Sequence, residues 1–503
     1  MTRKTKDKTP TRYPGTFQFP DGKTVVGELD LCGEETRLVL HSSERLDEKR
    51  HNLHISGTSY NGDYLTLVDC HINSSGQSHS KDGKTRFYAN YFPHFVVKGH
   101  NHIDPNSPCI KRIEFTTTDI SSLFYDFDAF GSVFSAEHII DSILAQARKI
   151  RPVATGEYPQ VLYFTGKECV IDVATAIGRV SVHHRPTSSL GGPEGVFIKN
   201  KIIVSIEVEL PENLESVIRK MHDVACYLSI LAGRAQGIEH IEIETINVVD
   251  EIPERLAIQP SFAWKTNTGD NQRDPHPGDI PLDAIHRPDE FKESLTHWLE
   301  RHPSWRAARV RYLGCLRKGN SYDVDRLVAA ANMFDILPET AVPSSAELSP
   351  ELTQAKNKCV ELLRNLSPSV DRDGALSALG RMGQPSLPKK VAHRAAIVNQ
   401  KLGSKFPELS FVTGIAIKCR NYFVHGSLGN LDYEKVEPFL PFLTDALEFV
   451  FAASDLIEGG WETERWAREP YGWGHSFTRF RASYEYDLQA LRDATTVGKN
   501  DSR

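Results

Sequence analysis

Short runs of apolar residues, separated by polar turn signals, fill the first half of the chain. Alternation of apolar and polar positions is typical of half-buried strands, and Asp-Gly or Asn-Gly pairs at 21–22, 61–62 and 82–83 favour hairpin turns between them. The predicted strands are 24–31, 36–40, 64–69, 87–92, 160–164, 168–172 and 202–209. This pattern predicts a β-rich, mostly antiparallel domain that resembles a sandwich or a barrel.

The hydrophobic period changes near Pro211. Apolar residues between Leu214 and Leu231 recur with helical spacing, and Gly233 is a helix stop signal. A strand at 238–246 is predicted to follow. We expect this helix and strand to complete the N-terminal domain.

Helical spacing dominates from Pro288 onward. The predicted helices are 290–301, 303–317, 324–337, 352–366, 389–402, 411–425 and 433–459. A loop-rich interruption is expected at 368–388, and the cations in and after it, including Lys389 and Lys390, are interpreted as solvated residues or as RNA contacts. The sequence therefore predicts an α+β protein, with a β-rich N-terminal domain followed by an all-α domain.

Shifts in composition divide the chain into five parts. They are a polar, basic tail at 1–12 that is expected to be disordered, a β-rich domain at 13–265, a turn-rich linker at 266–287, a helical domain at 288–460, and an aromatic-rich appendix at 461–503. Arginines interleave with the aromatic residues of the appendix, a pattern that can stack single-stranded bases. Because glutamates cancel that charge, we interpret the appendix as packing over the helical domain.

Charge and cysteine content narrow the function classes. A net charge of −7 argues against a bulk nucleic-acid coat, so any RNA contact must come from a local basic patch. The eight cysteines include no CxxC pair and favour free thiols in a reducing compartment. Without a visible signal peptide or an apolar run of membrane-spanning length, a cytoplasmic protein with no membrane partner is predicted.

A loose group of cysteines and histidines offers one metal hypothesis. Its members are Cys70, His71, His94, His100, His102 and Cys109. Their irregular spacing favours ordinary loop residues over a zinc site. His183, His184 and Arg185 are likewise interpreted as loop residues. We therefore assign no cofactor and no metal ligand, while a zinc-dependent activity of the N-terminal half stays an alternative.

The stretch from Arg420 to His425 concentrates reactive groups at a predicted helix end. Arg420, Asn421 and His425 follow the mostly apolar run 411–419 and precede Gly426, a stop signal. A neutral imidazole can take the proton of a ribose 2′-OH, and an arginine fork matches phosphoryl oxygens. The chemistry that fits is metal-independent RNA cleavage to a 2′,3′-cyclic phosphate and a 5′-OH. The alternative is an ordinary helix C-terminus, whose dipole favours His425.

These residues carry a resemblance to a known family. Arg-Asn-x-x-x-His at a helix end, inside a C-terminal all-α region, resembles the motif of HEPN-domain ribonucleases. The segments 15–29 and 325–338 also resemble the ApeA family of bacterial abortive phage-exclusion proteins, which pairs a β-rich N-terminal domain with a HEPN domain. The resemblance covers nearly the whole chain. It implies that Arg420, Asn421 and His425 are catalytic.

The resemblance also sets expectations for the predicted helix at 324–337. This helix carries three polar residues near its apolar stripe, Asp325, Asn332 and Asp335. Such HEPN helices can present a polar residue toward the motif of the later helix. Ordinary surface polarity is the alternative.

An anti-phage endoribonuclease is the function implied. His425 would act as general base, Arg420 would stabilise phosphoryl charge, and Asn421 would orient the phosphate or the imidazole. Arg420 and His425 lie about 140° apart on an ideal helix, so we expect the turn to unwind or a partner subunit to contribute. HEPN nucleases typically pair two motifs, which predicts a homodimer or a dimer of dimers.

Partners follow from the same resemblance. The expected substrate is structured host RNA, with tRNA as the leading candidate, and the expected activator is a phage protein sensed by the N-terminal domain. The alternative is a non-catalytic HEPN-like scaffold that binds RNA or nucleotide.

Overall fold

The computed structural model describes residues 11–46, 53–79, 84–193, 195–261, 274–344, 348–426, 432–469, 472 and 474–496. They form two compact units. The first contains the described residues up to Ser229, those from Gln236 to 261, and Leu282–Leu299; the second contains Ile230–Ala235, 274–281 and the described residues from Glu300 onward. The first unit is rich in strands and the second is helical, which confirms the predicted α+β class.

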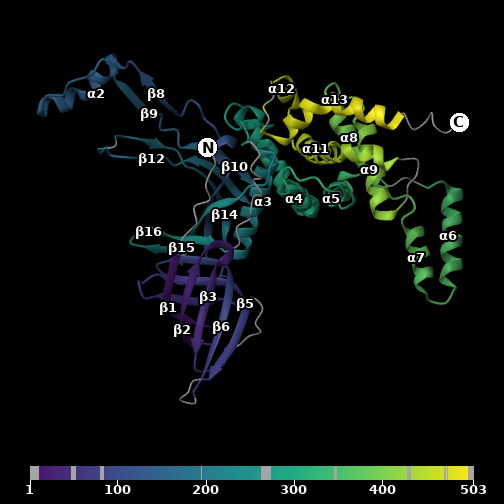
Figure 1. The fold of residues 1–503 in the computed structure, drawn as a ribbon, viewed down its shortest axis with the longest axis horizontal. Coiled ribbons are helices and arrows are strands. Elements are labelled where there is room, and N and C mark those ends of the chain that lie inside the picture. Colours follow the sequence, from purple (N-terminus) through teal and green to yellow (C-terminus); the bar gives the residue numbers. More distant parts are fainter. Residues whose placement is uncertain are drawn as a thin grey trace. The chain divides into compact units, whose positions relative to one another are not determined.

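The first unit is organised around one twelve-stranded antiparallel sheet (Figure 1). Its strands are β1 (Thr11–Gln18), β2 (Thr24–Leu31), β3 (Arg37–Ser42), β4 (Ile55–Ser59), β5 (Tyr64–His79), β6 (Thr85–Gly99), β7 (Ile110–Thr117), β10 (Cys169–Thr175), β11 (Gly178–His184), β14 (Ile202–Glu212), β15 (Ile238–Val249) and β16 (Ile252–Pro260). The strand order is β10-β11-β14-β7-β15-β16-β6-β3-β2-β1-β4-β5. Two smaller sheets pair β8 (Phe130–Phe134) with β9 (Gln160–Phe164) and β12 (Thr187–Ser188) with β13 (Ile198–Lys199).

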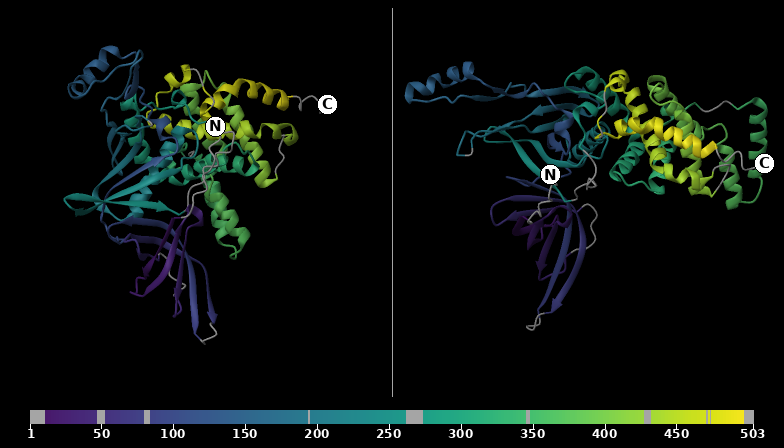
Figure 2. Two further views of the ribbon diagram at one scale, coloured as in Figure 1. Left: turned by 60° about the vertical axis from the view of Figure 1, so that its left-hand side comes forward. Right: turned by 45° about the horizontal axis from the view of Figure 1, so that its top comes forward.

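The long strand β6 closes part of this sheet into a barrel. One edge of β6 pairs with β5 along most of its length. On its other edge, residues 87–91 pair with β3 and residues 95–98 pair with β16. The ring β6-β3-β2-β1-β4-β5 is therefore complete, and its interior buries apolar side chains that include Phe17, Leu40 and Tyr91. Figure 2 shows this barrel, in purple and blue, from two further directions.

Short helices and one long helix accompany these sheets. They are η1 (Gly33–Glu35), α1 (Ile120–Leu123), α2 (Glu137–Ile150) and α3 (Leu214–Ala232). The predicted helix near Leu214 is confirmed as α3. Its Tyr227 packs against Phe291 and Trp298 of α4 (Pro288–Arg317), with ring centroids 5.8 and 5.4 Å apart.

The second unit is an all-helical bundle. Besides the end of α4, it contains η2 (Pro277–Asp279), α5 (Val324–Asp335), η3 (Glu339–Ala341), α6 (Pro350–Arg364), α7 (Val370–Gly380), α8 (Leu387–Leu402), α9 (Leu409–His425), α10 (Tyr433–Val436), η4 (Glu437–Phe439), α11 (Leu440–Glu458), α12 (Thr463–Arg468) and α13 (Ser476–Thr496). Helix α11 contacts α5, α8, α9 and α13. Because it is surrounded, most of its side chains are buried on every face.

Aromatic residues of the predicted appendix pack inward. Phe480 and Tyr484 of α13 lie against Phe406, with ring centroids 5.5 and 5.0 Å away. Trp466 of α12 stacks on Phe449 of α11. These rings are not free to stack on bases, although Tyr471 and Trp473 lie outside the described residues.

Three sequence predictions about these elements are wrong. The helices predicted at 290–301 and 303–317 are one helix, α4, which continues through Pro303. The predicted loop at 368–388 contains α7, whose first turn is capped by the Ser369 hydroxyl accepting from the Arg372 N–H. Residues 11–12 of the predicted tail belong to β1, while residues 1–10 lie outside the described residues.

Candidate active site

Helix α9 brings the Arg-Asn-x-x-x-His motif to an exposed end. Its apolar positions, among them Val412, Ala416 and Cys419, are buried in the bundle. The helix stops because Gly426 adopts the left-handed conformation (φ 66°), and its N–H donates to the Tyr422 carbonyl at 2.8 Å. This end places His425 in contact with solvent.

The three predicted catalytic residues lie together within one chain. Arg420 Nη1 donates to Asn421 Oδ1 at 3.1 Å and lies 3.3 Å from His425 Nε2. The helix stays regular through His425, so the expectation that the turn must unwind or a partner must contribute is wrong. The long arginine side chain spans the angular gap instead.

The Arg420–His425 contact relates to where the imidazole carries its proton. An arginine fork only donates, so Nε2 can accept from Nη1 only when that nitrogen carries no proton. When Arg420 donates in this contact, the imidazole is neutral and carries its proton on Nδ1. Its unprotonated Nε2 is the kind of atom that a general base requires.

Helix α5 supplies a second layer of contacts to Arg420. Arg420 Nη2 donates to Asn332 Oδ1 at 2.9 Å and lies 3.9 Å from Asp335 Oδ2. Asp325, on the same helix, makes no such contact within the described chain. Of the three polar residues flagged in the sequence, the structure brings two to the motif. Only 14% of the Arg420 side chain is exposed, and its buried Nε has no acceptor among the described residues.

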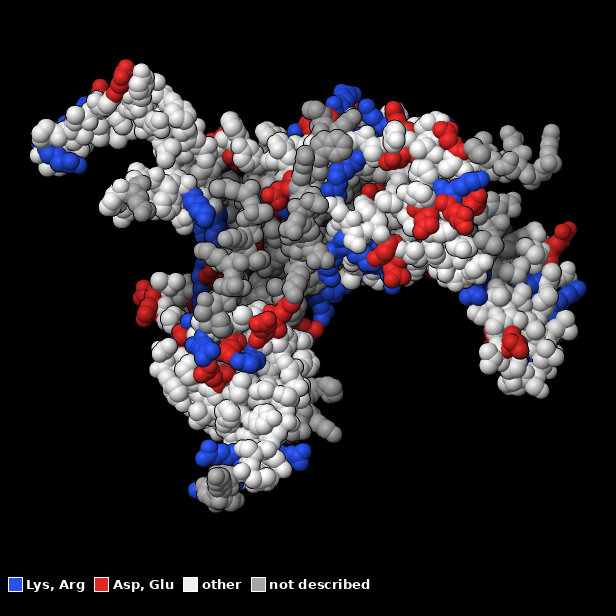
Figure 3. All heavy atoms as spheres, in the orientation of Figure 1, with Lys and Arg blue, Asp and Glu red and all other residues white. Residues whose placement is uncertain are grey.

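Lys390 adds a second cation beside this group. It lies in the first turns of α8, where its Nζ donates to the Asp335 backbone carbonyl at 2.8 Å and lies 3.9 Å from Asp335 Oδ1. Lys390 and Arg420 carry two positive charges against the one carboxylate of Asp335. This local excess suits a phosphate group even though the whole chain is acidic. Figure 3 shows both signs of charge interspersed on the face drawn.

Buried ion pairs hold the helices that carry this site. Arg326 of α5 donates through Nε and Nη2 to both carboxylate oxygens of Glu448 on α11, at 2.7 and 2.9 Å. Arg309 of α4 makes a similar bidentate pair with Asp455 of α11, at 2.8 and 2.9 Å. Burial raises the pKa of Asp455, but the charges of Arg309, Arg301 and Arg394 and the hydrogen bond from Arg309 together leave that pKa lowered. The first pair joins α5, and therefore Asn332, to α11, and the second joins α4 to α11.

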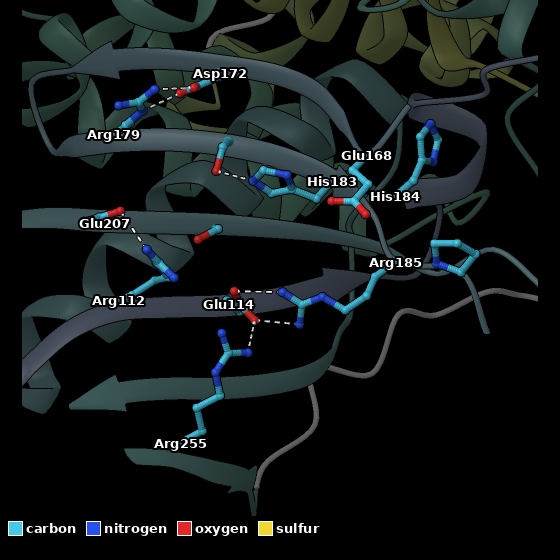
Figure 4. Close-up of a pocket in the computed structure, with 13 residues that line it drawn as sticks. Arg112, Glu114, Glu168, Asp172, Arg179, His183, His184, Arg185, Glu207 and Arg255 are labelled. Atoms are coloured by element: carbon cyan, nitrogen blue, oxygen red, sulfur yellow. Dashed lines mark hydrogen bonds and ion pairs between the residues drawn. The ribbon is translucent and has the colours of Figure 1, made fainter. Parts of the chain in front are cut away.

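A second polar site lies on the β-rich unit. A cavity of about 530 Å³ opens on the face of strands β7, β10, β11, β14 and β16. Figure 4 shows how the charged side chains of this face pair across it, with Arg185 and Arg255 both reaching Glu114. His183 and His184 end strand β11 and line the cavity, so their interpretation as loop residues is wrong.

Charge in this cavity is largely compensated. Burial raises the pKa of Glu114, but its hydrogen bonds with Arg185 and the charges of Arg185, Arg255 and Arg112 together lower that pKa. Burial, with the nearby charge of Arg185, lowers the pKa of His183. The cavity could hold a small polar ligand, but its cations are engaged with carboxylates. It is therefore a weaker candidate for catalysis than the end of α9.

Only two residues of the cysteine–histidine group predicted from the sequence lie together in the structure. Of its six residues, the structure brings His71 and His94 together, and it adds Asp69 to them. Cys70 is buried, and burial raises the pKa of its thiol. His102 lies elsewhere, 3.4 Å from the hydroxyl of Thr58. The group as predicted is not a site.

Two known protein-family models match this chain, one over its β-rich part and one over its helical part. Residues 12–301 match the family model described as ApeA N-terminal domain 1, and residues 328–465 match the model described as Apea-like HEPN. The first match runs past the predicted linker at 266–287, and the second begins within α5 and includes Asn332, Asp335 and the motif of α9. No curated protein and no solved structure gave a match.

The fold and the family match define a helical HEPN domain that follows a β-rich N-terminal domain in the sequence. The chain belongs to the ApeA family. Membership of this family supports a role as a nuclease-type protein of anti-phage defence. No helix in the described part of the chain is both long and apolar enough to cross a membrane.

Proposed function

We propose that this chain is an anti-phage endoribonuclease that cleaves RNA at the end of α9 without a metal ion. The observation that carries the proposal is the contact between Arg420 Nη1 and His425 Nε2, 3.3 Å apart. It sets a base and a phosphoryl-binding cation side by side at an exposed helix end.

The reaction begins at the ribose 2′-OH. His425 Nε2 takes its proton, and the 2′ oxygen attacks the adjacent phosphorus. Arg420 turns its Nη1 from the imidazole to the phosphoryl oxygens, where negative charge grows. Asn421, which accepts from Arg420 at 3.1 Å, holds the fork in place. The bond to the 5′ oxygen breaks, leaving a 2′,3′-cyclic phosphate and a 5′-OH.

Protonation of the departing 5′ oxygen needs an acid. One motif supplies one imidazole, and a second copy of the chain would supply another across a shared cleft. A homodimer or a dimer of dimers therefore remains the proposed assembly. Structured host RNA, tRNA above all, is the proposed substrate, and a phage protein that engages the N-terminal domain is the proposed activator.

The test is a phage challenge of bacteria that express wild type, His425→Ala or Arg420→Ala. We expect protection and new 5′-OH RNA fragments with wild type only, and Asp325→Ala is the matched control that should behave as wild type. If both motif variants are folded and still protect, the motif is only a helix end. RNA binding without cleavage by every variant would favour the scaffold alternative.

A further inference from the structure

Two histidines and an aspartate meet on the barrel, far along the chain from the HEPN motif. Asp69 and His71 lie on β5, two positions apart, so they share one face of the strand. Val68 pairs with Phe95 and Cys70 with Pro93, which sets Asp69 opposite His94 on β6. All three side chains therefore gather on the same side of the β5–β6 pair.

The polar atoms of these three side chains lie close enough together for one ion to reach all of them. His94 Nδ1 lies 2.5 Å from Asp69 Oδ2, and His71 Nε2 lies 3.5 Å from Asp69 Oδ1. The two imidazole rings are tilted against each other with centroids 4.6 Å apart. One ligand atom from each residue falls within 4.8 Å of the other two. Within the described residues this is the one such group of three.

The backbone is unusual at the centre of the group. Asp69 has φ 52°, in the left-handed region that residues other than glycine rarely adopt, and it does so within a strand. Its N–H donates to His54 Nδ1 at 3.2 Å, which helps to hold that conformation. Uncommon backbone conformations of this kind concentrate at functional sites.

We propose that Asp69, His71 and His94 bind one divalent transition-metal ion, zinc in the first instance, with a water molecule completing a tetrahedron. Zinc–ligand bonds of about 2.0–2.1 Å would set ligand atoms about 3.3 Å apart. The 3.5 Å between His71 and Asp69 already fits this spacing. The Asp69–His94 pair must open from 2.5 Å, exchanging a hydrogen bond for two metal bonds.

The types of ligand atom in this group indicate which metal ions it would bind. Two imidazoles and one carboxylate suit zinc and the neighbouring late transition metals, whereas magnesium and calcium prefer oxygen-only shells. The ion can enter, because 51% of the His71 side chain and 33% of the His94 side chain are exposed. The Cys70 side chain is not a ligand, because it is buried on the opposite face of β5 from Asp69 and His71. Such a site would tie β5 to β6, the strands that close the barrel.

The test is calorimetric titration of zinc chloride into untagged, chelator-treated full-length protein. We expect one ion per chain. His71→Ala and His94→Ala should each weaken zinc binding more than about 100-fold, because the loss of a residue that only hydrogen-bonds to a metal ligand already costs about 10–100-fold. His79→Ala is the matched control, since His79 is an exposed histidine of the same strand and bonds to Thr85 instead. It should bind zinc as wild type does.

Cobalt substitution gives an independent readout. The cobalt-loaded protein should show visible d–d absorption of a nitrogen–oxygen site and no thiolate charge-transfer band, and the His71→Ala variant should lose that absorption. A thiolate band would place the ion on a cysteine and overturn the proposal. So would the absence of zinc binding by wild type, or binding that survives in both histidine variants. His71→Ala is expected to stay folded because its side chain is half exposed.

Discussion

Asn332 offers a way to weaken the proposed catalytic arginine without touching the motif. Its Oδ1 accepts from Arg420 Nη2 at 2.9 Å, and it lies on a different helix, α5. Asn332→Ala removes this acceptor. Arg420 keeps its contacts to Asn421 and His425, but it loses its hydrogen bond to α5 and retains there only the 3.9 Å contact with Asp335.

The expected cost follows from the contact removed. A hydrogen bond to a charged group is worth about 1.5–3 kcal/mol. If that energy orients Arg420 in the transition state, kcat/KM falls about 10- to 150-fold, since each 1.36 kcal/mol is a factor of ten. Asp335→Ala should cost less than about fivefold, because its carboxylate is 40% exposed and 3.9 Å away.

The assay follows cleavage of end-labelled tRNA by purified full-length protein, with lysate of phage-infected cells as the source of activator. Lysate alone is the blank. Asp325→Ala is the control, because it lies on α5 without touching Arg420. If Asn332→Ala melts at the wild-type temperature and cleaves at the wild-type rate, then Asn332 does not position Arg420 and the reasoning fails.

Two further predictions concern the helical bundle. Asp455→Ala should lower the free energy of unfolding by about 3–5 kcal/mol in urea titrations, because it removes the carboxylate that pairs with the fully buried Arg309; an unchanged midpoint would contradict this. Asp445 is different: burial and the Glu448 carboxylate raise its pKa from 3.8 to about 7. The folded state then holds a proton that the unfolded state has lost, so this stabilisation is full below about pH 4 and disappears as the pH rises through 7. Relative to Asp445→Asn, wild type should lose up to about 4 kcal/mol between pH 4 and 8, and parallel pH profiles of the two proteins would refute this.

The helix that carries the motif could be predicted closely from the sequence. The apolar run before Arg420 and the glycine at 426 are local signals, and α9 ends at His425 as expected. The contact between Arg420 and His425 could not be predicted, because it depends on the reach of a flexible side chain. The choice of Asn332 and Asp335 over Asp325 likewise depends on how α5 packs against α9.

The wrong predictions for α4 and α7 have causes in the nearby sequence. Pro303 was expected to separate two helices, but a proline costs one hydrogen bond, and the buried Trp298 and Trp305 on either side hold α4 continuous. The loop prediction also overlooked the start signal of α7, which is the Ser369 cap followed by two aspartates in the first turn.

The pairing of strands that lie far apart in the sequence could not be predicted. The two halves of β6 pair with different strands on one edge, and that choice closes the barrel. The same pairing brings His94 opposite Asp69, which no spacing in the sequence indicates. The site proposed there could be found only once the register of β5 and β6 was known.

The central claim is that His425 and Arg420 cleave RNA through its 2′-OH. Its most direct test is the chemistry of the ends that activated, purified protein leaves on labelled tRNA. Wild type should give 5′-OH and 2′,3′-cyclic phosphate ends, and His425→Ala and Arg420→Ala should each give at least about 100-fold less product. Fragments with 5′-phosphate ends, or undiminished cleavage by either folded variant, would contradict the account.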